Sequence, residues 1–500
     1  MKFQVFKEGE LVKDFKLCGA YLFGTDGIAI RKAKLAFKDG VIRCEKSNFE
    51  TAGMALLWPI DSIGKILLPT TCLPEREKPY ILNVEIARAK LMEIINKCED
   101  WLYFNSQGEL FDDTRQLFTK AVQNISDAPL ASKFADESLK KSITLSESLA
   151  VRQSITLFNK RVKNRRFSRG CLGCNLDPAF IGDEKYVKNM TSVFGKVNIP
   201  INWAKIERKK GEYDFSEIDA CMEALASKKL AISAGPILKF SKETLPIWLI
   251  RKKREFETVR DAAYKFITNL VSRYALNVKS WRVINGLNAY NYFGFGFEQV
   301  LEMTRAANMA VKAESGKAKR IVEVANIWGE YYSAVPNTIP PVVYIDMMVQ
   351  SGINFDAFGI QMRFGKDLAG MHIRDLMQIS AALDHFSVLG KPLVITEVEV
   401  PSEPGIENEN GNIAGLWHGQ WSRRLQSQWL EHLYIIAFSK FFVDSVTYSH
   451  FVDSSNSVIT NSGLTTKDME PKESYQTIQK LRKIIFSKQA EGETHSQTGQ

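Results

Sequence analysis

Three consecutive segments point to the fold: SWRVINGL (280–287), EQVLEMTRAANMAVKA (298–313) and RIVEVANIW (320–328). The first and third are short apolar runs typical of buried strands. The middle segment carries apolar residues at helical spacing, with charged residues on the opposite face. A strand, an amphipathic helix and a second strand in this order predict one βαβ unit of a parallel sheet.

The same alternation repeats on both sides of this unit, between residues 168 and 488. The predicted strands are GCLGCNL (170–176), KVNIPINW (196–203), LAISAGPIL (230–238), SWRVINGL (280–287), RIVEVANIW (320–328), AFGIQMRF (357–364), PLVITEVEV (392–400) and SVTYSHFVD (445–453). These strands and the helices between them predict an α/β protein with a (β/α)₈ TIM barrel. A doubly wound sheet fits less well, because no GxGxxG turn follows the first strand.

The flanking sequence predicts three further segments. Residues 1–82 contain short apolar runs broken by Gly, Asp and Asn, which predict a β-rich, sandwich-like accessory domain. Residues 83–167 are helix-prone and predict a helical connector that ends in the basic run KRVKNRR (160–166). We interpret this run as a solvated helix end rather than a nucleic-acid patch. The polar tail 489–500 is expected to be disordered.

Composition excludes several classes of protein. The net charge of +9 on 500 residues is too mild to indicate a nucleic-acid partner. We find neither a secretory signal at the N-terminus nor an apolar run long enough for a membrane span, so a cytoplasmic location without membrane contact is expected. The seven scattered cysteines fit reduced thiols. The pair Cys171 and Cys174 lacks nearby His or Cys partners, so we expect no metal and no cofactor.

Polar and aromatic residues gather at the predicted carboxyl ends of the strands, where ligands bind in a barrel. Amides and carboxylates bond hydroxyl groups, and aromatic rings stack on sugars, so these residue types favour a carbohydrate site over a phosphate or metal site. The candidate residues are Asn202, Asn285, Trp328, Glu330, Gln361, Arg363, Glu397, Glu399 and Tyr448.

The segment PLVITEVEV (392–400) places Glu397 where a buried strand reaches the mouth of the predicted barrel. A carboxylate in this position can act as the nucleophile of a retaining glycosidase. The alternative interpretation is a salt-bridged glutamate at a strand end.

Several stretches in the right order resemble the xylanase-type barrels of glycoside hydrolase family 10, over about residues 168–455. They are NWAKIERKKGEYDFSEID (202–219), TLPIWL (244–249), SWRVING (280–286), FDAFGIQ (355–361) and VITEVEV (394–400). The resemblance implies that Glu397 is the nucleophile and that Asn285 bonds the sugar beside it. It also matches Gln361 to the family's strand-6 Gln and Glu399 to its usual Asp.

The chain departs from this pattern at the acid/base position, where Gly286 stands in place of a glutamate. Arg363 replaces the strand-6 His, and Asn202 replaces a Lys. Glu330, just past the fifth predicted strand, is the candidate for a relocated acid, and a loop glutamate with a structural role is the alternative. If only the carboxylate is missing, Gly286→Glu is expected to raise activity on natural linkages.

Two functions remain open. The first is a glycoside hydrolase with a retaining mechanism that uses Glu397, and the second is a catalytically inactive glycan-binding pseudoenzyme. The expected partner in both is an oligosaccharide or glycoconjugate, not nucleic acid. A carboxyl other than Glu399 about 5–6 Å from Glu397 across an open cleft would favour hydrolysis.

Overall fold

The computed structural model describes residues 1–47, 50–101, 108–251, 255–404, 413–455 and 457–493. Its largest sheet is a closed barrel of eight parallel strands, in which the third strand is split into β12 and β13. The pieces are β10 (Leu172–Asn175), β11 (Lys196–Ile199), β12 (Ala231–Ala234), β13 (Leu238–Lys239), β14 (Ser280–Asn285), β15 (Lys319–Val324), β16 (Ala357–Arg363), β17 (Leu393–Glu399) and β19 (Val443–Tyr448). The predicted (β/α)₈ barrel is confirmed.

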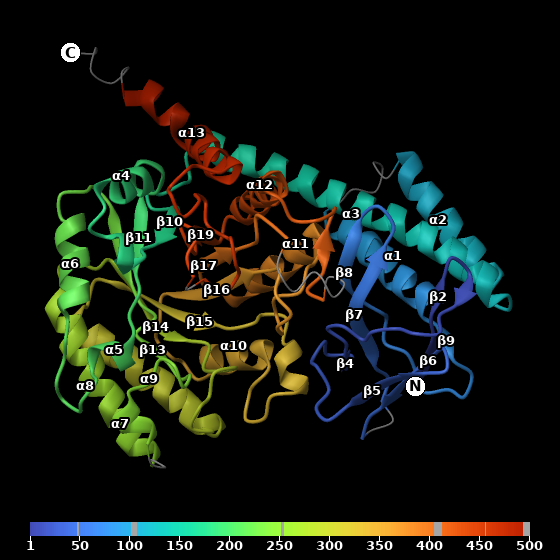
Figure 1. The fold of residues 1–500 in the computed structure, drawn as a ribbon, viewed down its shortest axis with the longest axis horizontal. Helices are drawn as coiled ribbons and strands as arrows, with labels where there is room; N and C mark the ends of the chain where they lie inside the picture. Colours follow the sequence, from blue (N-terminus) through green and yellow to red (C-terminus); the bar gives the residue numbers. More distant parts are fainter. Residues whose placement is uncertain (48–49, 102–107, 252–254, 405–412, 456, 494–500) are drawn as a thin grey trace.

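Helices surround these strands because each apolar helix face covers the outer side of the sheet (Figure 1). They are α4 (Glu184–Val193), α5 (Trp203–Ile206), α6 (Ser216–Leu225), α7 (Ile247–Ile250), α8 (Phe256–Tyr274), α9 (Phe297–Glu314), α10 (Pro341–Gln350), α11 (Leu376–His385), α12 (Arg423–Ser439) and α13 (Glu473–Glu493). Helix α13 runs past residue 489, so the first part of the predicted disordered tail is helical. Residues 494–500 lie outside the described residues.

The described strands before residue 82 form one four-stranded sheet, three strands of a second four-stranded sheet and a short hairpin. They are β1 (Lys2–Gln4), β2 (Phe6–Lys7), β3 (Glu10–Leu11), β4 (Tyr21–Phe23), β5 (Lys34–Lys38), β6 (Val41–Glu45), β7 (Gly53–Ile60), β8 (Gly64–Pro69) and β9 (Tyr80–Ile81). One sheet takes its edge strand, β18 (Leu416–Trp417), from the segment after β17 of the barrel. The N-terminal strands are therefore joined to the barrel through a shared sheet.

Three helices link this β-rich part to the barrel: α1 (Leu82–Asp100), α2 (Gly108–Gln123) and α3 (Ala128–Lys163). Helix α3 packs along α12 (Figure 1). At its end, Arg161 donates hydrogen bonds to the carbonyls of Phe438, Lys440 and Val443 at 2.8–3.2 Å. This arginine of the KRVKNRR run therefore caps the end of α12. The division into separate domains stays a prediction.

No helix in the described part of the chain is long and apolar enough to span a bilayer.

Candidate functional site

Two β-bulges aim polar side chains into the carboxyl-terminal half of the barrel. In β14 the register against β15 shifts between Arg282 and Ile284, and in β17 the residue after Ile395 is skipped, so that Glu397 pairs with Gln361. A bulge re-aims the residues that follow it. In a strand without a bulge, side chains alternate strictly between the two faces of the sheet. Some of these polar side chains would then point away from the barrel interior.

Glu397 lies between two arginines. One of its oxygens is 2.8 Å from Nη2 of Arg282, and the other is 3.3 Å from Nη1 of Arg363. Arg363 also donates a 2.8 Å hydrogen bond to Oε1 of Gln361. Burial alone would raise the pKa of Glu397, but the charges of Arg363 and Arg282 outweigh burial and hold this pKa at about 2. Glu397 is therefore an ionised, ion-paired carboxylate with 17% of its side chain exposed.

A second carboxylate, Glu323 of β15, lies beneath Glu397 and shares the same arginine. Nη2 of Arg282 is 2.8 Å from Oε1 of Glu323, and Thr396 donates a hydrogen bond to the same oxygen. The nearest oxygens of Glu323 and Glu397 are therefore at most twice 2.8 Å apart. Gly359 makes room for this arrangement, since a Cβ there would lie 2.7 Å from Cγ of Glu323.

This upper bound on the separation of Glu323 and Glu397 is compatible with the separation of a retaining carboxyl pair, about 5–5.5 Å. However, Glu323 is completely buried and Arg282 occupies the space between the carboxylates. Burial raises the pKa of Glu323, opposed by Arg282. Neither Arg282 nor Glu323 was predicted from the sequence, although a charged residue between apolar neighbours, as in WRVI (281–284) and IVEV (321–324), was a signal.

Gly286 adopts a backbone conformation that other residues rarely take, with φ at +56°. A Cβ at this position would lie 2.4 Å from Cβ of Ala325 and 3.0 Å from the ring of Tyr290. The position therefore lacks a carboxylate and also has no space for one. The expectation that Gly286→Glu restores an acid does not fit this geometry.

Asn285 ends β14 at the mouth of the barrel, beside Lys239 of β13 and Glu323 of β15 in the register. It is 2% exposed, and its Oδ1 has no hydrogen-bond partner among the described residues. Buried amide oxygens are normally bonded, so an unpaired one is suited to a ligand hydroxyl. Asn198 of β11 also has an unpaired buried Oδ1, while its amide donates to Gly235 at 3.0 Å.

Glu330 lies on the side of the barrel that faces the N-terminal strands. It begins a short 3₁₀ helix (Glu330–Ser333), is ion-paired with Arg374 and accepts a hydrogen bond from the Gly370 amide. Tyr21 of β4 interacts with the same arginine. Burial would raise the pKa of Glu330, but Arg374 outweighs it and the pKa is lowered. These contacts support the structural interpretation of Glu330, because a general acid needs a raised pKa.

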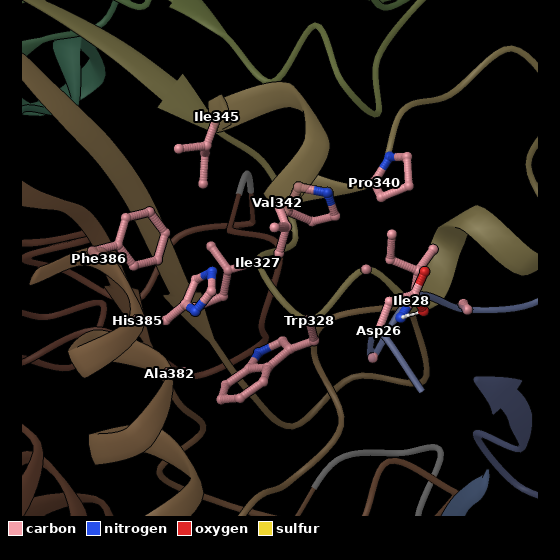
Figure 2. Close-up of a pocket in the computed structure, with 14 residues that line it drawn as sticks. Asp26, Ile28, Ile327, Trp328, Pro340, Val342, Ile345, Ala382, His385 and Phe386 are labelled. Atoms are coloured by element: carbon pink, nitrogen blue, oxygen red, sulfur yellow. Dashed lines mark hydrogen bonds between the residues drawn. The ribbon is translucent and has the colours of Figure 1, made fainter. Parts of the chain in front are cut away.

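The Trp328 side chain also lies where the barrel meets the N-terminal strands. Arg374 stacks on its ring at 4.1 Å, and the ring lines a cavity of about 230 Å³ between the N-terminal loop around Ile28 and helices α10 and α11. Figure 2 shows Trp328 and His385 facing this cavity, with Asp26 on the other side. Its walls are mainly apolar, and neither Glu397 nor Asn285 is among the residues that line it.

The three other predicted site residues have partners within the protein. Glu399 is buried and accepts hydrogen bonds from Ile459 N and Ser462 Oγ, both at 2.9 Å. Tyr448 is completely buried and donates to the carbonyl of Ser462. Asn202 caps α5 by accepting from the Lys205 amide at 3.2 Å. Tyr448 in particular presents no surface to a ligand.

The family model of glycosyl hydrolase family 10 matches residues 162–480, more than half of the chain. The chain belongs to glycosyl hydrolase family 10. The endo-1,4-beta-xylanase 5-like protein of Arabidopsis thaliana is 21% identical to this family-10 chain over 294 residues, which are 57% of the chain and 49% of that protein. The chain thus spans about half the length of this curated relative.

Two solved structures share the family-10 barrel. Xylanase 10B of Thermotoga maritima has a TM-score of 0.51 at 16% identity, covering 66% of this chain and 98% of that one. Xylanase 10B of Thermotoga petrophila RKU-1, solved with xylobiose, has a TM-score of 0.50 at 17% identity, covering 65% and 96%. At these identities the likeness concerns the fold.

The mouth of this family-10 barrel thus holds amide groups that can bond hydroxyls and one ionised carboxylate clamped by arginines. Within the described ranges, no group of three or more His, Cys, Asp or Glu side chains is placed to hold a metal ion. The chemistry that these residues support is recognition of a polar, hydroxyl-rich ligand.

Proposed function

We propose that this family-10 chain binds a carbohydrate at the carboxyl-terminal mouth of its barrel and does not hydrolyse ordinary glycosidic bonds. The observation that carries the proposal is the clamp of Arg282 and Arg363 on Glu397. Retaining hydrolysis requires a carboxylate that is free to attack the anomeric carbon. Both oxygens of Glu397 are engaged, and a carboxylate with a pKa of about 2 is a weak nucleophile.

The acid side of the reaction is missing as well. Gly286 has no proton to give, and Glu330 is held by Arg374 at the contact with the N-terminal strands. General-acid help typically contributes about 10²–10⁴-fold to such reactions. Without a general acid, an alkoxide leaving group departs slowly, so this protein should leave natural glycosidic linkages uncleaved.

Recognition is supported by the groups that remain. Asn285 has an unpaired buried oxygen, and Gln361 lies beside Glu397 in the register. Amides of this kind select hydroxyl-bearing ligands because an unfilled polar group in a buried site is costly. The ligand class is an oligosaccharide or the glycan of a glycoconjugate.

One observation favours a second candidate function, slow hydrolysis of activated glycosides. Glu397 is ionised at neutral pH and is partly exposed. An aryl glycoside with a good leaving group needs little protonation, so Glu397 could still attack it if Arg363 moves away.

The proposal is tested by titration calorimetry with neutral xylo-oligosaccharides and by a parallel aryl-glycoside assay. We expect binding without cleavage, and a loss of affinity of about tenfold or more in Asn285→Ala. The matched control is Asn277→Ala, an exposed residue in the loop before β14 at the opposite end of the barrel. Hydrolysis of natural oligosaccharides that Glu397→Gln abolishes would contradict the proposal, and hydrolysis confined to aryl glycosides would favour the second candidate.

A further inference from the structure

Three cations lie near the carboxylates Glu323, Glu397 and Glu399 at the mouth of the barrel, and one of the three forms no ion pair among the described residues. Arg282 and Arg363 are paired with Glu323 and Glu397. The third cation is Lys239, the last residue of β13, which neighbours Asn285 in the register. Among the described residues no carboxylate oxygen lies within 4.0 Å of its Nζ, so its charge is not neutralised by an ion pair.

Tyr290 holds this lysine at the site. The Lys239 ammonium lies 4.3 Å from the centre of the Tyr290 ring, a cation–π contact. Tyr290 also interacts with Arg363. The three side chains therefore form a continuous wall that reaches Glu397, and the charge of Lys239 helps to lower the pKa of that carboxylate.

Glu397 and Glu243 both feel the charge of Lys239, but neither forms an ion pair with it. A half-buried ammonium without a close ion-pair partner can bind an anionic group, because a charge-assisted bond there is less screened than at the open surface. Glu397 does not repel such a group strongly, since Arg282 and Arg363 together balance the charges of Glu323 and Glu397. The neighbouring Asn285 oxygen can accept a hydrogen bond from a hydroxyl group. A ligand that contacts both Asn285 and Lys239 therefore carries hydroxyl groups and an anionic group.

We propose that the carbohydrate bound at this mouth is acidic, and that its carboxylate or sulfate group pairs with Lys239. The inference rests on the proposed function, because it names the class of sugar that the same site takes. Uronate and sulfated sugars share the chemistry that Lys239 recognises, so the experiment separates them.

The test compares three probes of equal length by titration calorimetry: a neutral xylo-oligosaccharide, an oligogalacturonate and a sulfated oligosaccharide. We expect at least one acidic probe to bind about ten- to a hundredfold more tightly than the neutral one. This advantage should shrink as salt is raised and should disappear in Lys239→Met. Lys242→Met, an exposed lysine three residues further along, should leave all affinities unchanged.

Thermal melting of each variant checks that a loss of binding is not a loss of folding. Equal affinities for neutral and acidic probes would overturn the inference and leave the proposed function intact. An advantage that survives Lys239→Met would also overturn it. If none of the probes binds to the intact protein, the proposed function fails as well.

Discussion

At the scale of single residues, the site is defined by an arginine clamp and by a glycine that nothing larger can replace. Arg282 joins Glu323 to Glu397, and Arg363 closes on the other oxygen. Gly286 lies beside this cluster with φ at +56°. The backbone strain at Gly286 and the charge of Glu397 each have a measurable effect on stability.

The first prediction concerns Gly286→Ala. The variant should lower the free energy of unfolding by more than the roughly 1–3 kcal/mol that a strained backbone costs, because its Cβ also collides with Ala325. Denaturant unfolding measures the change. Gly390→Ala is the matched control, since Gly390 has φ at +64° but open space around it. Equal costs at the two positions would contradict the collision, and Gly286→Glu should be at least as unstable as Gly286→Ala.

The second prediction concerns the pH dependence that Glu397 contributes. Its pKa falls from an ordinary 4.5 to about 2 on folding, so its contribution is present above pH 4.5 and is lost as the pH falls toward 2. This contribution is on the order of 3 kcal/mol. Between pH 6 and 3 the wild-type protein should lose more stability than Glu397→Gln, in denaturant titrations at each pH. The exposed Glu257→Gln should behave like the wild type, and parallel curves for Glu397→Gln would refute the assignment.

At the scale of secondary-structure elements, Asp375 has two roles at the start of α11. It accepts from the amides of Met377 and Gln378 at 2.9 and 3.1 Å as the N-cap. It also forms a buried ion pair at 2.8 Å with Lys90 of α1. One side chain therefore starts a barrel helix and fixes the first N-terminal helix to it.

The third prediction separates these two roles. Asp375→Asn keeps an oxygen for the cap but leaves Lys90 with Glu93 alone, so the variant should lose about 3 kcal/mol of unfolding free energy. Asp375→Ala should lose about 1 kcal/mol more, the usual value of a cap. Asp183 caps the exposed start of α4 and forms no ion pair within the described part of the chain, so Asp183→Ala should cost only about 1 kcal/mol. Equal losses in Asp375→Asn and Asp183→Ala would show that the ion pair contributes little.

At the scale of the whole molecule, the N-terminal strands, the three linking helices and the barrel share interfaces rather than meeting at a flexible joint. Strand β18 completes an N-terminal sheet, and Glu147 of α3 accepts hydrogen bonds from Trp417 and from the Leu376 amide at 2.8 and 3.2 Å. These contacts are buried, so breaking them exposes surface on both sides.

The fourth prediction is that the protein unfolds in one cooperative step. Differential scanning calorimetry should show a single transition, because the barrel and the N-terminal part stabilise each other through buried contacts. A chain that begins at residue 168 should melt at a lower temperature or aggregate, since it uncovers apolar faces of α11 and α12. Two resolved transitions, with the second matching the truncated chain, would show independent domains.

The amino-acid sequence alone determined the barrel. Burial alternates locally along each strand and helix, so eight strand-and-helix units can be counted without knowledge of their neighbours. Residue order likewise predicted that Glu397 lies near the carboxyl end of its strand, where ligands bind in a barrel. The same logic placed Asn285 and Gln361 at that end.

Only the tertiary structure decided what surrounds these residues. The partners of Glu397 come from strands over 30 and over 100 residues away, and two β-bulges aim them at it. Trp328 was predicted as the last residue of the fifth strand and Glu330 just past it, but β15 ends at Val324, and both side chains contact Arg374 beside the N-terminal strands. Periodicity reports which face of an element is buried, whereas the identity of the buried neighbour depends on how distant segments meet.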